Sequence, residues 1–206
     1  MRLRASVYID GFNIYHSIQA NSFPNELKWV SYAALAKLLL PAGSEIVHTK
    51  VFTAIGSHYP QSAARQRVWL KALEANQCEV ILGRFKMRDR VCKSCGVSWV
   101  GHEEKETDVN ISLHILNDCY KNSLDQILVL TNDTDLVPAV QMVRAEFPRI
   151  QIVQASIRKP HVVWDRVVDQ SRTISAAMLR QALLPETVVL PSGRVLTRPE
   201  AYDPAP

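Results

Sequence analysis

The chain contains 206 residues, of which 47% are hydrophobic and 21% are charged. This balance excludes disordered and fibrous proteins and suits a single domain with one sizeable core. The 24 basic and 20 acidic residues give a formal net charge of +4, which permits a nucleic-acid partner without requiring one.

Neither a membrane protein nor a secreted protein is expected. No apolar run approaches the roughly 20 residues that cross a bilayer. Asp10 interrupts the first apolar run, so we expect no signal peptide. Four cysteines are too few for a dense disulfide framework at this length, and we therefore expect a reducing, cytoplasmic location.

The hydrophobic patterns predict strands and helices that alternate along the chain. In chain order the predicted strands are 7–9, 46–52, 78–85, 127–130 and 150–153. The predicted helices between them are 29–40, 60–76, 105–120 and 136–147. This alternation predicts an α/β fold with helices on both faces of a central parallel sheet of about five strands.

Local signals support several of these elements. The run 127–130 is continuously apolar, as is typical of a strand covered on both faces. Pro60 suits the first turn of a helix. The predicted helix 105–120 has apolar residues at helical spacing, namely Val109, Leu113, Leu116 and Tyr120. After the first strand, the pair Asp10-Gly11 predicts a loop.

The predicted domain covers residues 1–158 and carries a cysteine-containing insertion at about 84–104. A C-terminal extension follows over 159–206. It contains one predicted helix at 171–184, and we expect its tail from Pro191 onward to be loosely ordered.

Carboxylates follow several of the predicted strands. Asp10 ends the first strand, Asp133 and Asp135 follow the strand 127–130, and Asp108 lies in the first turn of its helix. Ligands of an open parallel sheet bind at the carboxyl ends of the strands, so these side chains are predicted to converge. Clustered carboxylates repel one another unless a cation neutralises them, and Mg²⁺ prefers oxygen ligands. The pattern therefore suits metal-assisted phosphodiester hydrolysis.

Each of these residues also has a structural interpretation. Asp133 could cap the following helix, and Asp108 could complement the dipole of its own helix. Asp10 could be a turn residue before Gly11. Together on one edge, they favour the metal-site interpretation.

Three segments around these aspartates resemble the NYN domain family, a branch of the PIN-like nucleases. They are residues 7–13 (VYIDGFN), 105–109 (KETDV) and 131–138 (TNDTDLVP). The resemblance covers about 7–153 and implies a three-layer α/β/α PIN-like fold with a metal-dependent ribonuclease site. Where the family usually has Ser-Gly-Asp, this chain has Thr131-Asn132-Asp133, and asparagine tolerates the left-handed backbone that glycine would adopt.

The resemblance also implies roles for individual residues. Asp10, Asp108, Asp133 and Asp135 would hold Mg²⁺ or Mn²⁺, and Asn13 would contact the RNA substrate or a metal-bound water. A non-catalytic NYN-type module that binds RNA or protein stays open as the alternative. Retention of all four carboxylates favours the enzyme.

The insertion contains a second candidate site. Cys92, Cys95 and Gly96 have the spacing of one half of a structural zinc site, and His102 is a candidate third ligand. The fourth ligand would come from elsewhere or from another subunit, so the cysteine insertion could join two copies of the chain. The alternative is a turn with two reduced thiols.

Basic residues alternate along the start of the same insertion. Arg84, Lys86, Arg88 and Arg90 would share one face of an extended strand. Four cations on one face suit the phosphate backbone of a nucleic acid, although a solvated strand face has the same pattern.

Overall fold

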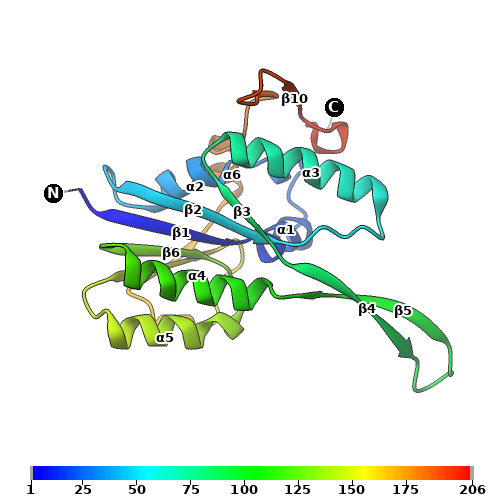
Figure 1. Ribbon diagram of the computed structural model, residues 1–206, viewed down its shortest axis with the longest axis horizontal. Coiled ribbons are helices and arrows are strands. Elements are labelled where there is room, and N and C mark those ends of the chain that lie inside the picture. The colour runs from blue at the N-terminus through cyan, green and yellow to red at the C-terminus, as the bar shows by residue number, and fades with distance from the viewer. Residues whose placement is uncertain (1, 205–206) are drawn as a thin grey trace.

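A six-stranded, wholly parallel sheet forms the centre of the computed structural model, which describes residues 2–204 (Figure 1). The strands are β1 (Arg4–Asp10), β2 (Glu45–Thr53), β3 (Glu79–Leu82), β6 (Gln126–Leu130), β7 (Gln151–Ser156) and β8 (Gln170–Thr173). Their order is β3-β2-β1-β6-β7-β8. The α/β class with a central parallel sheet is thus confirmed. The sheet has six strands rather than about five because β8 pairs with β7.

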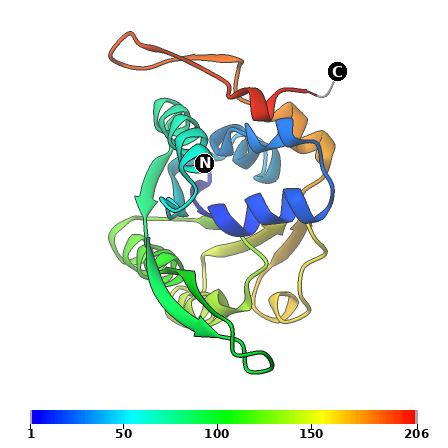
Figure 2. The same cartoon turned by 90° about the vertical axis from the view of Figure 1, so that its right-hand side faces the viewer.

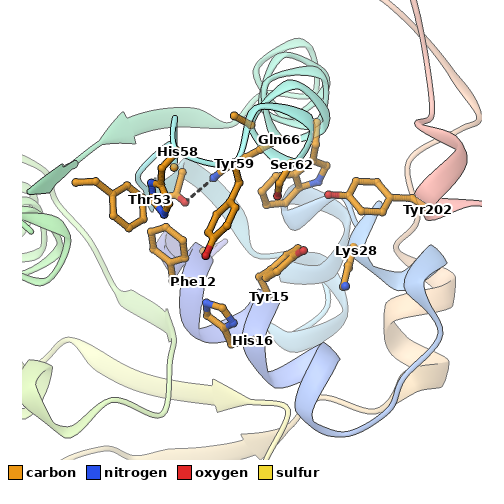
Figure 3. A pocket seen from close by; sticks show the side chains of 15 residues that line it. Phe12, Tyr15, His16, Lys28, Thr53, His58, Tyr59, Ser62, Gln66 and Tyr202 are labelled. Carbon is orange, nitrogen blue, oxygen red and sulfur yellow. Dashed lines mark hydrogen bonds between the residues drawn. The ribbon is translucent and has the colours of Figure 1, made fainter. Parts of the chain in front are cut away.

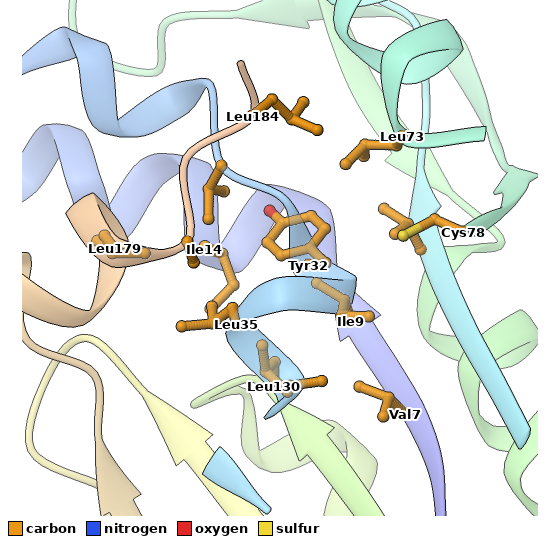
Figure 4. Close-up of a cluster of buried hydrophobic side chains, with 14 of the residues drawn as sticks. Val7, Ile9, Ile14, Tyr32, Leu35, Leu73, Cys78, Leu130, Leu179 and Leu184 are labelled. Atoms are coloured by element: carbon orange, nitrogen blue, oxygen red, sulfur yellow. The ribbon is translucent and has the colours of Figure 1, made fainter. Parts of the chain in front are cut away.

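Helices cover both faces of this sheet and give three layers. On one face lie α1 (Gly11–Ala20), α2 (Tyr32–Leu39), α3 (Pro60–Ala75) and α6 (Ala176–Gln181), and on the other lie α4 (Thr107–Lys121) and α5 (Val137–Glu146). Each face has its own buried core, because side chains alternate along a strand. Val7 and Ile9 of β1 enter the first core, shown in Figure 4, whereas Tyr8 enters the second.

The strand order reverses between β1 and β6. From β1 the chain builds outward to β2 and β3, and it later returns to the other side of β1 with β6, β7 and β8. In an open parallel sheet such a reversal leaves a crevice at the carboxyl ends of the two strands. Asp10 ends β1, and the segment 131–135 directly follows β6, so the fold brings two of the predicted acidic segments to this crevice.

Helix α1 was not predicted, because Asp10-Gly11 has the appearance of a turn. The chain instead passes from β1 into α1 with no intervening loop. Asp10 is the N-cap, and its carboxylate accepts a hydrogen bond from the Asn13 backbone N–H. Gly11 permits the close approach of α1 to β2, since a Cβ there would lie 3.0 Å from the Phe52 carbonyl oxygen.

The buried face of α4 also differs from the predicted one. Val109, Leu113 and Tyr120 are 59–66% exposed, whereas Ile111 and Ile115 are fully buried against the sheet. Two apolar stripes run along this helix, and the spacing of residues alone does not show which one faces the core.

The insertion forms a two-stranded antiparallel arm that extends away from the sheet (Figures 1 and 2). It consists of β4 (Arg84–Val91) and β5 (Ser98–Lys105). The single strand predicted at 78–85 is divided at Gly83, with β3 in the sheet and β4 in the arm. Gly83 is needed there because a Cβ would lie 2.6 Å from the Lys105 carbonyl oxygen.

The segment after residue 158 is more ordered and less helical than predicted. The helix predicted at 171–184 is replaced by β8 and the shorter α6, and the tail forms a hairpin of β9 (Thr187–Val189) and β10 (Val195–Thr197). Tyr202, in the short 3₁₀ helix Glu200–Tyr202, is buried against the body. The division into domains at residue 158 stays a prediction.

Three further 3₁₀ helices complete the fold: Asn25–Lys28, Thr134–Leu136 and Trp164–Arg166. Within residues 2–204, no helix has both the length and the apolar character that crossing a membrane requires.

Candidate active site

Asp10 is the most deeply buried acidic side chain at the crevice, with 6% of its surface exposed. Its two carboxylate oxygens have different partners. Oδ1 accepts the Asn13 backbone N–H at 2.9 Å, and Oδ2 accepts the Thr131 hydroxyl at 3.0 Å. The end of β1, the start of α1 and the end of β6 therefore hold this carboxylate in one orientation.

Thr131 links Asp10 to Asp133. Its hydroxyl donates to Asp10 and accepts a hydrogen bond from the Asp133 backbone N–H at 3.1 Å. The Asp133 carboxylate in turn caps the next 3₁₀ turn, accepting the Asp135 backbone N–H at 3.0 Å. The capping role is therefore present, and it fixes the side chain at the mouth of the crevice rather than removing it from the site.

Asn132 does not adopt the left-handed backbone expected at this position. Its side chain instead holds the loop after β7: its Oδ1 accepts the His161 N–H at 2.9 Å, and its Nδ2 donates to the Lys159 carbonyl at 3.3 Å. Its own backbone N–H donates to Asn13 Oδ1 at 3.1 Å. The asparagine thus fastens two loops that border the site.

Asp108 completes a group of three carboxylates with Asp10 and Asp133. One oxygen of each lies within 4.8 Å of the others, which is close enough for a single cation to contact all three. Asp108 reaches this position from the first turn of α4. Asp135 is exposed and lies outside the group, so the structure brings together three of the four predicted acidic residues.

The environment raises the pKa of two of these carboxyls. Burial, together with the charges of Asp108 and Asp133, raises the pKa of Asp10 from 3.8 to about 6, against the opposing effect of its two hydrogen bonds. Burial and the neighbouring charges of Asp133, Glu104 and Asp135 raise the pKa of Asp108. Both shifts express the cost of gathering like charges, which a bound cation would relieve.

The three carboxylates line a cavity of about 330 Å³, here called the acidic cavity. Three of its other lining residues are Glu104, Arg158 and His16. Glu104 accepts hydrogen bonds from the backbone and side chain of Thr107. The sequence prediction did not include Glu104 or Arg158. Arg158 follows β7, so the rule that sites lie at strand ends could have found it.

The structure does not bring His102 to the cysteine pair. Cys92 and Cys95 lie in the turn of the arm, whereas His102 pairs with Met87 within it and stacks on His58 with ring centroids 3.7 Å apart. The Gly96 N–H donates to the Cys92 carbonyl, and the Ser94 hydroxyl lies 3.0 Å from Cys92 Sγ. Zinc binding by the two cysteines stays a prediction.

The four predicted cations lie on β4, and three of them have acidic partners. Arg84 pairs with Glu106, and both Arg88 and Arg90 pair with Glu103. Lys86 forms no ion pair with any residue in the range 2–204. The positive charge of this strand is therefore smaller than the sequence suggests, and its role in binding RNA stays a prediction.

Comparisons with known proteins agree with this architecture. The model of the NYN domain family matches residues 4–174. A Pseudomonas putida protein named 6-hydroxy-3-succinoylpyridine 3-monooxygenase is 30% identical, over 69% of this chain and 56% of its own length. The chain thus spans little more than half of that relative.

A crystal structure of a Vibrio parahaemolyticus protein of unknown function superposes with a TM-score of 0.58 at 20% identity. The match covers 89% of this chain and 97% of that one. At this level of identity, the likeness shows the fold alone.

Proposed function

The chain belongs to the NYN domain family, and from that premise we propose that it is a metal-dependent ribonuclease that hydrolyses phosphodiester bonds of RNA. Family membership confirms the resemblance found in the sequence and indicates a nuclease-type protein. The observation that carries the proposal is the group of Asp10, Asp108 and Asp133, whose carboxylate oxygens lie within 4.8 Å of one another.

The donor set fits a hard divalent cation such as Mg²⁺ or Mn²⁺. All three donors are carboxylate oxygens, and the cavity around them leaves room for water and a substrate phosphate, which Mg²⁺ usually retains among its ligands. When bound, the ion would supply a nucleophilic water and stabilise charge on the phosphate. In this proposal Asp135 contributes negative charge from the rim.

The chain's own residues would position the substrate and the carboxylates. Thr131 and the start of α1 orient Asp10. Because Asn13 Oδ1 accepts the Asn132 N–H, its Nδ2 amide remains able to donate to a phosphate oxygen. Arg158, on the wall of the acidic cavity, would pair with the phosphate that neighbours the scissile bond.

Cleavage of labelled single-stranded RNA with Mg²⁺ or Mn²⁺ tests the proposal. We expect Asp10→Asn and Asp133→Asn each to lower the rate by at least about 100-fold, because a carboxylate ligand is lost. Glu146→Gln, at the far end of α5, removes an exposed acid and should leave the rate unchanged.

Activity that survives both aspartate substitutions would contradict this mechanism. If no RNA is cleaved and no ion binds, the non-catalytic NYN-type module that binds RNA or protein becomes the better description.

The name of the Pseudomonas relative raises a second candidate, hydroxylation of a substituted pyridine ring. A cavity lined by aromatic side chains beside the carboxylates favours it, since such a cavity accepts a planar heteroaromatic ring. To test it directly, the protein is incubated with 6-hydroxy-3-succinoylpyridine, a reductant and oxygen. Loss of the ultraviolet absorbance of this compound measures its consumption. We place the nuclease first because the carboxylate group is the distinguishing feature of the site.

A further inference from the structure

A second cavity, of about 260 Å³, lies beside the acidic cavity at the first turns of α1, and Figure 3 shows the side chains that line it. Its walls are mostly aromatic, and we call it the aromatic cavity. They include Phe12 and Tyr15 of α1, Tyr59 at the start of α3, Phe85 of β4 and Tyr202 of the C-terminal segment. Four segments far apart in the sequence thus contribute rings to one hollow.

The two cavities are adjacent. Phe12 and His16 line both of them, and Gly11, the neighbour of Asp10 in the chain, lines the aromatic cavity. A molecule that occupies both would place a phosphate near the carboxylates and a ring among the aromatic side chains. A nucleotide has this form, with a planar base joined to a phosphate through a ribose.

Tyr59 is the most informative ring of the wall. It is 67% exposed although it borders a cavity, and it lies against His58 with ring centroids 4.4 Å apart. In Figure 3, Tyr59 lies in the middle of the cavity, with His58 and Phe12 on one side of it and Tyr15 on the other. An exposed, laterally supported aromatic ring is the usual platform on which single-stranded nucleic acid stacks its bases.

The remaining wall supplies polar groups for the edge of a base. Gln66 Nε2 donates to Thr53 Oγ1 at 3.2 Å and to the Ala54 carbonyl at 3.0 Å, which fixes the amide and leaves its carbonyl oxygen as an acceptor. Ser62 lies one turn earlier on α3. Lys28 Nζ, held 4.7 Å from the centre of the Tyr15 ring, adds a positive charge at the opposite side.

We propose that the aromatic cavity binds the base of a nucleotide next to the scissile phosphate, with Tyr59 as its stacking partner. The proposal deepens the ribonuclease function and rests on it for the identity of the substrate. The volume suits one base rather than a longer segment, because it lies just below the range of about 300 Å³ and more that is typical of drug-sized ligands.

Binding of nucleoside monophosphates tests this inference without any cleavage. Affinities of the four ribonucleoside 5′-monophosphates are compared with that of ribose 5-phosphate, which carries the phosphate and sugar without the base. We expect at least one nucleotide to bind about 10-fold more tightly or better, in line with the free energy of stacking one base on an aromatic ring. Aromatic NMR signals of Tyr59 and His58 should shift during the titration.

Substitutions then assign the binding to the cavity. Tyr59→Ala should remove the advantage of the nucleotide over ribose 5-phosphate, and Tyr59→Phe should keep it. Tyr120→Ala is the matched control, because Tyr120 is 66% exposed on α4, outside the lining of the aromatic cavity. Ser62→Phe, which fills the hollow from the first turn of α3, gives a second, independent block.

Three outcomes would overturn the inference: equal binding of nucleotides and ribose 5-phosphate, no effect of Tyr59→Ala and Ser62→Phe, or tighter binding of a phosphate-free ring such as 2-hydroxypyridine. The RNA cleavage assay keeps the two proposals distinguishable. RNA cleavage together with equal binding of nucleotides and ribose 5-phosphate would refute the base site alone, whereas base binding without any cleavage would refute the ribonuclease alone.

Discussion

Asp10 combines a structural and a candidate catalytic role, and its structural role is that of a helix cap rather than the turn residue that the sequence suggested. It is a capping residue of α1 and, at the same time, a member of the carboxylate group. The capping hydrogen bond from Asn13 and the hydrogen bond from Thr131 hold its oxygens in place and partly offset the charge of its neighbours. Its position at the end of the first strand was predictable, whereas the double role of Thr131 depends on the pairing of β1 with β6.

The raised pKa of Asp10 predicts a pH dependence of stability in the metal-free protein. The pKa is about 6 in the folded chain against 3.8 for the ordinary group, so the folded state binds this proton more tightly than the unfolded state. The free energy of unfolding should therefore rise as the pH falls from 7.5 towards 4.5. The full shift of about two pKa units corresponds to about 3 kcal/mol, of which about 2 kcal/mol is gained by pH 4.5 and the rest at lower pH, as the carboxyl of the unfolded chain becomes protonated.

Urea unfolding in EDTA measures this effect as the difference between wild type and Asp10→Asn, since other groups titrate in both proteins. The wild type should gain stability relative to the variant over this pH range. If the free energy of unfolding depends on pH in the same way in both proteins, the surroundings of Asp10 do not destabilise its ionised carboxylate.

The placement of the fourth aspartate predicts unequal effects within the acidic set. Asp108 lies in the group of three carboxylates, and Asp135 lies outside it and is exposed. We expect Asp108→Asn to lower RNA cleavage by at least about 100-fold and Asp135→Asn by about 10-fold or less. Rates at saturating RNA and Mg²⁺ measure both, and a larger loss for Asp135→Asn would place the ion elsewhere.

At the scale of elements, the strands of the sheet were more predictable than their connections. A continuous apolar run identifies β6, because a strand covered on both faces has no polar alternation, whereas β-branched residues identify β2. Helix α1 was missed because a glycine after an aspartate usually marks a turn, and here it marks a close approach to β2. The insertion was recognised at about 84–104, but the start of its first strand was not, because only the contact at Gly83 shows that 78–85 is two strands.

The arm offers a test of the predicted cationic strand. Lys86 has no acidic partner in an ion pair within residues 2–204, so it is the cation of β4 most available to a phosphate. Lys86→Ala should weaken binding of single-stranded RNA and reduce the slope of log affinity against log salt by about 0.7. Lys121→Ala, at the opposite end of α4 from Asp108, should change neither quantity.

Binding is measured by fluorescence anisotropy at four salt concentrations with an RNA that is not cleaved in EDTA. An unchanged slope for Lys86→Ala would show that this face of β4 is exposed to solvent and does not contact RNA.

The turn of the arm predicts zinc bound by cysteines from two copies of the chain. Hydrogen bonds from the Ser94 hydroxyl and from the backbone N–H groups of Ser94 and Cys95 lower the pKa of Cys92, which favours the thiolate that zinc requires. Since His102 lies away from the turn, one chain supplies two ligands of four. We expect half a zinc ion per chain and a dimer that chelation dissociates.

Elemental analysis and light scattering with and without chelator measure both quantities, and Cys92→Ser should abolish the metal and the dimer together. A monomer that still holds one zinc ion per chain would require other ligands within the chain.

At the scale of the whole molecule, a buried ion pair joins two of the three layers. Lys50 of β2 lies 2.6 Å from Asp118 of α4, and both side chains are at most 6% exposed. The Tyr8 hydroxyl of β1 donates to the same carboxylate oxygen at 3.0 Å, and His114 lies 3.2 Å from Lys50. The pair fixes α4, the helix that carries Asp108, onto β2, and the Tyr8 hydrogen bond joins α4 to β1, the strand that carries Asp10. No local pattern in the sequence connects these residues.

This arrangement predicts a stability effect that is separate from catalysis. Asp118→Ala leaves the buried Tyr8 hydroxyl without its partner and leaves Lys50 with only the exposed Glu79 carboxylate, 3.9 Å away. It should lower the free energy of unfolding by about 3 kcal/mol, the lower end of the range for a broken buried pair. The double variant Lys50→Met with Asp118→Leu removes both charges and should cost far less.

Asp118 lies ten residues from Asp108, or about 15 Å along α4. The fraction of Asp118→Ala that remains folded should therefore keep nearly normal RNA cleavage. Urea unfolding of the wild type, Lys50→Met, Asp118→Leu and the double variant gives the coupling between the two charges. A loss below about 1 kcal/mol for Asp118→Ala would mean that water reaches this pair and that packing of the second core alone holds α4 in place.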